Sequence, residues 1–164
     1  MHKWMLVVVL VFFLVSGCSR AGGGGYTAGD IRGYNHTQQG INHFTVNGYG
    51  GGVRGNTCCI LLPDKWTPEL KAHVEWEVDI NPYIVLPPLG TDAFRRAYAK
   101  HEASYQKHSM VVDIPQYGKE RCGITVHFLP CNQVKVTTIC DGYGTPDYPI
   151  KEPLEMKEPA QCPK

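Results

Sequence analysis

The segments that most restrict the fold of this chain are residues 122–128 and 134–140, which alternate in polarity and each carry a cysteine at the outer end. An alternation with a period of two predicts strands that bury one face. Residues 129–133 lie between the segments and have the length of a hairpin loop. When Phe128 is placed opposite Val134, the apolar faces of the two strands coincide, whereas a shift of one residue would separate them.

The same register sets Cys122 directly opposite Cys140. Opposed residues in a non-hydrogen-bonded pair of strands come close enough for a disulfide. We therefore predict a Cys122–Cys140 bridge that closes the open end of this hairpin.

The remaining cysteines beyond residue 18 are even in number, which predicts further disulfides in an oxidising compartment. They are Cys58, Cys59, Cys131 and Cys162. Adjacent residues of a strand point to opposite faces, so we expect Cys58 and Cys59 to bond to different partners among Cys131 and Cys162 rather than to each other. A zinc cluster is the alternative, but the chain has no C-x-x-C pair, and we predict no metal site.

Residues 71–80 show the clearest strand pattern, with one face expected to be buried by Ala72, Val74, Trp76, Val78 and Ile80. Shorter strands are expected at residues 30–37, 42–47, 57–62 and 109–114. One helix is expected to follow Thr91, which can cap it, with Asp92 in the first turn. Many short strands separated by turn residues predict a mainly β fold, either an antiparallel β-sandwich or a partly open barrel, with one helix and stabilising disulfides.

The N-terminal segment has the three-part layout of a secretory signal peptide, with the basic Lys3, an apolar run over residues 4–15, and small residues before Cys18. A cysteine directly after two small residues is typical of a bacterial lipoprotein signal, on which Cys18 receives lipid, palmitate included, and becomes the new N-terminus. An ordinary secreted protein is the alternative. Ser19 favours the outer membrane over the inner one, so we expect a lipid-anchored protein of the cell envelope that faces the periplasm from the outer membrane.

We divide the chain into four parts on this basis. Residues 1–17 form the signal peptide, and residues 18–25 hold the lipidated cysteine and a glycine-rich linker. Residues 26–143 form the β-rich domain. Residues 144–164 are rich in proline and are expected to run extended over the surface, fastened through Cys162.

Charge and catalytic motifs exclude several functions. The chain has 16 Lys and Arg residues against 15 Asp and Glu residues and no basic stripe, so nucleic acid is not an expected partner. Beyond Ser19 the serines are Ser104 and Ser109, and neither lies in a G-x-S-x-G turn. The glycine-rich residues 48–55 lack the Lys-Ser/Thr of a phosphate-binding loop and predict a hairpin loop instead. We expect a protein that is not an enzyme and needs no cofactor.

Five segments together resemble a known family. They are Gly33-Tyr-Asn-His-Thr37, Phe44-Thr-Val-Asn-Gly48 with the glycine-rich residues that follow, Cys58-Cys-Ile-Leu-Leu-Pro-Asp-Lys-Trp-Thr-Pro68, Val74-Glu-Trp76, and Val126-His-Phe-Leu-Pro130. On these motifs the chain resembles the bacterial lipoproteins of the DUF3304 group over residues 30–138.

Members of this group are often encoded beside type VI secretion effectors of the lipase or phospholipase kind. The resemblance therefore implies a periplasmic immunity protein that binds and neutralises a cognate lipase or phospholipase effector. A tether to the membrane that the effector attacks would raise the effective concentration of such an inhibitor. The alternative is a structural or assembly lipoprotein of the envelope that binds a machine component or peptidoglycan.

For the surface that contacts the effector we predict Tyr34, Asn35 and His36, together with Tyr49 and Arg54. Tyrosine and arginine often supply much of the binding energy at protein interfaces. The alternative for the first three residues is a structural turn that holds the adjacent strand in place.

Overall fold

The protein is described here by a computed structural model that covers residues 25–53 and 55–163. The signal segment, the predicted lipidation site Cys18 and the predicted contact residue Arg54 lie outside the described residues. Within the described part of the chain, no helix has the length and hydrophobicity needed to cross a membrane.

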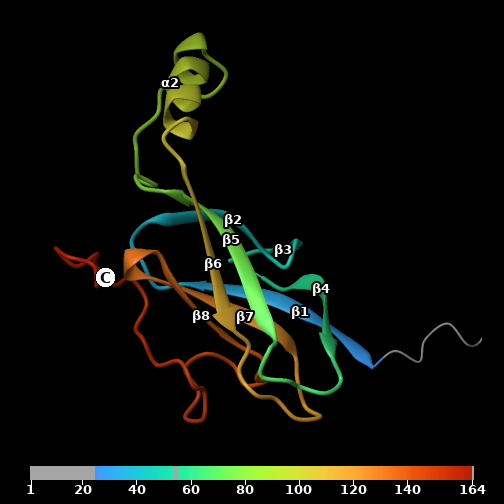
Figure 1. Cartoon of the computed structure of the whole chain (residues 1–164). Coiled ribbons are helices and arrows are strands. Elements are labelled where there is room, and N and C mark those ends of the chain that lie inside the picture. The colour runs from blue at the N-terminus through green and yellow to red at the C-terminus, as the bar shows by residue number, and fades with distance from the viewer. Residues whose placement is uncertain (1–24, 54, 164) are drawn as a thin grey trace, which may run out of the picture.

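Two four-stranded sheets pack face to face and form the body of the molecule (Figure 1). The first sheet has the order β4-β1-β7-β8, with bounds Thr57–Pro63, Tyr26–Asn35, Gly123–Leu129 and Gln133–Thr137. The second has the order β3-β2-β5-β6, with bounds Tyr49–Gly51, Gly40–Val46, Lys71–Asp79 and Gln106–Asp113. The predicted mainly β fold with one α-helix is confirmed, and the two sheets do not form a closed barrel.

The helix α2 (Asp92–Glu102) begins where the sequence predicts, because the Thr91 hydroxyl accepts a hydrogen bond of 3.0 Å from the Phe94 amide. A single 3₁₀ turn, η1 (Pro130–Asn132), joins β7 to β8. The core between the sheets includes Phe44 of β2 and Phe128 of β7, whose ring centres lie 5.1 Å apart.

The alternating pattern of β5 predicts its buried face correctly from Ala72 to Val78 and fails at its end. Ile80 is 45% exposed because the strand ends at Asp79. Asp79, expected on the wet face, is buried, and its Oδ2 lies 2.9 Å from His101 Nε2, which supplies a hydrogen-bonding partner. A partner supplied by a distant element has therefore overridden the local pattern.

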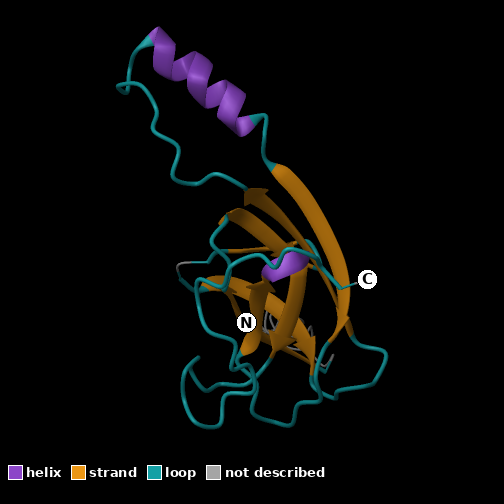
Figure 2. Ribbon diagram, turned by 90° about the vertical axis from the view of Figure 1, so that its left-hand side faces the viewer, coloured by secondary structure: helices purple, strands orange, loops and turns teal. Residues whose placement is uncertain are grey.

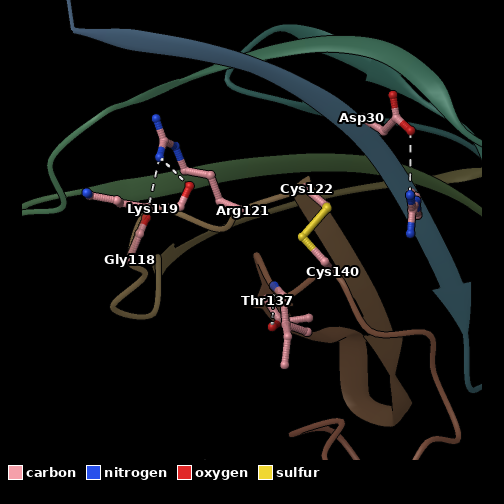
Figure 3. The surroundings of a disulfide bond; sticks show 9 residues. Asp30, Gly118, Lys119, Arg121, Cys122, Thr137 and Cys140 are labelled. Carbon is pink, nitrogen blue, oxygen red and sulfur yellow. Dashed lines mark hydrogen bonds and ion pairs between the residues drawn. A yellow bond between two sulfur atoms is a disulfide. The ribbon is translucent and has the colours of Figure 1, made fainter.

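The β7–β8 hairpin has the predicted register, with Phe128 opposite Val134 and Val126 opposite Val136. The Cα atoms of Cys122 and Cys140 lie 4.9 Å apart at its open end, where the structure joins them by a disulfide (Figure 3).

The pairing expected for the other cysteines is wrong. The structure joins Cys131 to Cys162, with Cα atoms 5.5 Å apart, and joins Cys58 to Cys59. Cys58 lies beside Asp30, which in turn lies beside Gly123 at the start of β7. Cys131 follows the far end of β7, so the length of a seven-residue strand, about 20 Å, separates it from Cys58.

The strand β1 pairs with β7 in parallel, whereas the other strand pairs are antiparallel. The two strands approach so closely at Gly29 and Gly123 that a Cβ atom on either would overlap with the backbone of the other strand. Gly123 also has a φ of +92°, which a residue with a side chain rarely adopts. These two glycines therefore permit the parallel pair that the antiparallel prediction missed.

The glycine-rich segment contains more structure than the predicted loop. Asn47 and Gly48 both have positive φ angles and form a two-residue turn between β2 and β3. The three residues of β3 then pair with the end of β2.

Candidate functional site

The predicted contact residue Asn35 forms a turn at the end of β1. Its Oδ1 accepts hydrogen bonds of 2.9 Å from both the amide and the hydroxyl of Thr37, and its Nδ2 donates to the Gln39 carbonyl at 2.7 Å. The carbonyl oxygen and the amino group of this side chain therefore each have a partner within the protein. The structural alternative for this segment describes Asn35 better than a role in binding.

The side chains of His36, His127 and Tyr148 form a chain of hydrogen bonds, called here the histidine relay. His36 Nε2 lies 2.7 Å from His127 Nδ1, and His127 Nε2 lies 2.7 Å from the Tyr148 hydroxyl. His36 Nδ1 lies 3.0 Å from the carbonyl oxygen of Pro153. All three side chains are buried, so His36 offers no surface to a partner and its assignment to a contact surface is wrong.

One arrangement of protons satisfies every bond of the relay with neutral side chains. The Pro153 carbonyl can only accept, so His36 Nδ1 carries a proton and donates it. His36 Nε2 then accepts from the Nδ1–H of His127, and His127 Nε2 accepts from the Tyr148 hydroxyl. Burial, with a smaller effect of His36, lowers the pKa of His127 to about 3, and burial raises the pKa of Tyr148 to about 12.

The relay fastens the C-terminal segment, residues 141–163, across the outer face of the first sheet. Every residue of β7 is consequently buried, although β7 has the second sheet on one side only. Glu152 of the segment pairs with Lys135 of β8, and this hydrogen bond lowers the pKa of the Glu152 carboxyl. The Met156 amide donates to the His36 carbonyl at 2.6 Å. The segment is thus part of the folded structure rather than a loose extension.

A groove lies where the C-terminal segment, the end of β1 and the start of the β5–α2 connection meet. It consists of two adjoining hollows of about 750 Å³ and about 560 Å³. They share five lining residues, namely Asn35, Gln39, Pro82, Tyr83 and Leu154. Tyr34, a predicted contact residue, also lines the smaller hollow, and its ring packs on His127 with centres 5.1 Å apart.

The second candidate surface is the arm, residues 80–105, which contains α2 and projects away from both sheets (Figures 1 and 2). His101 is its one buried residue among those that the structure describes, and His101 Nε2 lies 2.9 Å from Asp79 Oδ2 at the base of the arm. The connection before α2 is apolar and exposed, since 93% of Val85 and 83% of Leu89 are accessible to water. Sequence reasoning missed this surface, although its run of apolar residues between prolines was a visible signal.

Tyr49, also predicted as a contact residue, is exposed on β3. The strand β2 runs from Gly40, beside the groove, to Val46, beside Tyr49. The length of β2 therefore separates Tyr49 from Tyr34, and the structure does not bring these two predicted residues together.

A family model described as "Protein of unknown function (DUF3304)" matches residues 34–136. The chain belongs to this family. The DUF3304 region includes His36, His127 and the whole arm, while Tyr148, Pro153 and Leu154 lie beyond it. No curated protein and no solved structure is significantly similar to this DUF3304 protein.

Proposed function

We propose that this DUF3304 protein is a lipid-anchored immunity protein of the periplasm that binds and neutralises a lipase or phospholipase effector of type VI secretion. The lipoprotein-like N-terminus and the family membership support this proposal. The single observation that carries it is the arm. This segment projects from the body, is fixed at its base, and exposes apolar side chains that a partner would bury.

Exposed apolar side chains are common one at a time, but a run of them on a projecting segment marks an interaction site. Val85 and Leu89 flank the prolines Pro87 and Pro88, which restrict the backbone and lower the entropy lost on binding. The buried Asp79–His101 pair fixes the base of the arm to the sheet. These features fit insertion of a pre-organised apolar element into a concave partner.

The position of the arm is compatible with a membrane tether. The strand β1 (Tyr26–Asn35) begins at the end of the body away from α2 (Figure 1). The proposed anchor at Cys18 would then join the body, through the glycine-rich linker, at an end that does not carry the arm. The attachment therefore leaves the arm accessible to a protein partner in the periplasm.

The immunity protein would need no catalytic residues to neutralise the effector in this way. A lipase must admit an acyl chain through an apolar opening to reach its catalytic residues. An apolar arm seated at that opening would exclude the lipid by occupying the same surface, with Val85 and Leu89 as the expected contact residues.

The test is lipase turnover by the purified effector encoded beside this gene, measured with increasing amounts of this protein. We expect turnover to fall to zero near a 1:1 ratio. The double variant Val85→Asp/Leu89→Asp should lose at least tenfold in affinity, because it would bury two charges in the contact. Val111→Asp is the matched control, since Val111 is 60% exposed on β6, outside the arm.

Unchanged turnover together with no measurable complex of the wild-type protein would contradict the proposal and favour the structural or assembly lipoprotein instead. Inhibition that survives in the Val85→Asp/Leu89→Asp variant would keep the immunity function and show that another surface makes the contact.

A further inference from the structure

We propose that the groove binds a neutral carbohydrate, with the Tyr83 ring as a stacking platform and the Gln39 and Asn81 side chains as hydrogen-bonding partners of sugar hydroxyls. This inference does not rest on the proposed function, because Val85 and Leu89 lie outside the groove lining.

The lining of the groove has an unusual composition. It contains five carboxamide side chains, which belong to Asn35, Gln38, Gln39, Asn42 and Asn81. Among the described residues that line it there is no Lys, Arg or His, although the chain has 16 Lys and Arg residues and 7 His residues. These described lining residues therefore offer no positive charge to phosphates, carboxylates or nucleic acid. Carboxamides both donate and accept, which suits the hydroxyl groups of an uncharged ligand.

Two of these carboxamides are available to a ligand. The other three are occupied, since Asn35 holds its own turn, Asn42 donates to Glu77 at 3.1 Å and Gln38 donates to the Glu155 carbonyl at 3.4 Å. Among the interactions of the described residues, the side chains of Gln39 and Asn81 form no hydrogen bond. Both line the larger hollow, Gln39 from the β1–β2 turn and Asn81 from the start of the arm.

Tyr83 supplies the flat apolar surface that a sugar ring needs. It is 84% exposed and lines both hollows. Leu154, which is 50% exposed, adds apolar surface from the C-terminal segment. The ring of a tyrosine can bind the C–H face of a sugar while the tyrosine hydroxyl remains in contact with water. Tyrosine is amphipathic in this way at interfaces in general.

The groove is also lined by the carboxylates Glu155 and Glu158, which could attract a cationic peptide as an alternative ligand. Glu158 is held in place, because its Oε2 accepts a hydrogen bond of 2.7 Å from the Cys131 amide. The five carboxamides outnumber the two carboxylates and favour the uncharged ligand, to which Glu155 can offer an acceptor for a hydroxyl.

The experiment is a titration of the isotope-labelled protein, followed by amide chemical shifts, with two neutral probes. A trimer of N-acetylglucosamine represents an N-acetylated glycan strand, and maltotriose represents a plain glucan. We expect saturable shifts confined to residues 35–42, 80–83 and 154–158 with at least one probe. The probe that binds more tightly identifies the source of the carbohydrate.

Variants locate the site. Tyr83→Ala should weaken binding at least tenfold, Gln39→Ala at least threefold, and Tyr83→Phe less than threefold because it keeps the ring. Tyr26→Ala is the matched control, since Tyr26 is also an exposed tyrosine but lies at the start of β1 and outside the groove. Because Tyr83 is exposed, its variants should fold as the wild type does, and unchanged spectra outside the groove check this.

Three results would overturn the proposal. They are the absence of saturable shifts with both probes, equal binding by Tyr83→Ala and the wild type, and tight binding of an arginine-rich peptide in the groove with no response to either sugar. The last result would identify the groove as a site for cationic peptides.

Discussion

Acidification should destabilise this protein through one buried side chain, His127. Its pKa is lowered to about 3 in the folded protein from an ordinary value of 6.5. The unfolded chain therefore binds a proton at pH values where the folded protein does not, and the free energy of unfolding falls as the pH decreases below 6.5. A proton added to His127 would also point an N–H toward Tyr148, whose hydroxyl then loses its acceptor.

The magnitude follows from the two pKa values. Between pH 7 and pH 5 the unfolded state gains about 2 kcal/mol from protonation of this residue, while the folded state gains almost nothing; by pH 4 the difference reaches about 3 kcal/mol. The contribution of His127 is complete above pH 6.5 and is lost progressively down to about pH 3. For a domain of this size, 2 kcal/mol corresponds to a decrease in melting temperature of about 6 °C.

Carboxyl groups also titrate toward the lower end of this range, so the measurement is a comparison of variants. Urea unfolding followed by tryptophan fluorescence, with disulfides intact, is carried out from pH 7 to pH 5 for the wild type and His127→Gln. We expect the variant to be less stable at pH 7 but to lose about 2 kcal/mol less than the wild type on acidification. His43→Gln, at a histidine whose side chain is 63% exposed, should follow the wild type. Equal losses in the wild type and His127→Gln would refute the reasoning.

Three other predictions test the covalent and backbone features. Peptide mapping without reduction should find Cys122 joined to Cys140 and Cys131 joined to Cys162, and the double variant Cys131→Ser/Cys162→Ser should lose about 2–5 kcal/mol of stability; a map with other partners for these cysteines would contradict the structure. Gly123→Ala should cost about 2 kcal/mol or more in urea unfolding, because its Cβ would overlap with Asp30 at a positive φ, whereas Gly50→Ala, which has free space, should be within about 0.5 kcal/mol of the wild type. Cells fed a clickable fatty acid should label the wild-type protein and leave Cys18→Ala unlabelled as a larger precursor, and an unlabelled wild type would rule out the lipid anchor.

Features set by neighbouring residues were predictable from the sequence. The register of the β7–β8 hairpin follows from two short alternating segments and the loop between them, since one residue of slip would expose an apolar face. The helix start at Thr91 follows from a single capping side chain. Both depend on contacts across a few residues, which a sequence displays directly.

Features that depend on distant segments were not predictable. His36 and His127 resemble ordinary surface histidines in the sequence, and they are buried only because Tyr148 and Pro153 cover them from the C-terminal segment. The pairing of Cys131 with Cys162 likewise requires knowing where this segment ends. The groove combines three segments far apart in the chain, and none of them carries a recognisable binding motif alone.

The C-terminal segment contributes to both the histidine relay and the groove, and the DUF3304 region alone completes neither of them. Pro153 accepts the last hydrogen bond of the relay, and the next residue, Leu154, forms one wall of the groove. A change that loosens the relay would therefore displace that wall, and a ligand in the groove would hold the segment against the sheet. Because such coupling is reciprocal, the groove should bind a sugar more weakly at acidic pH, where the relay is weakest, and the sugar should raise the stability of the folded protein less there than at neutral pH.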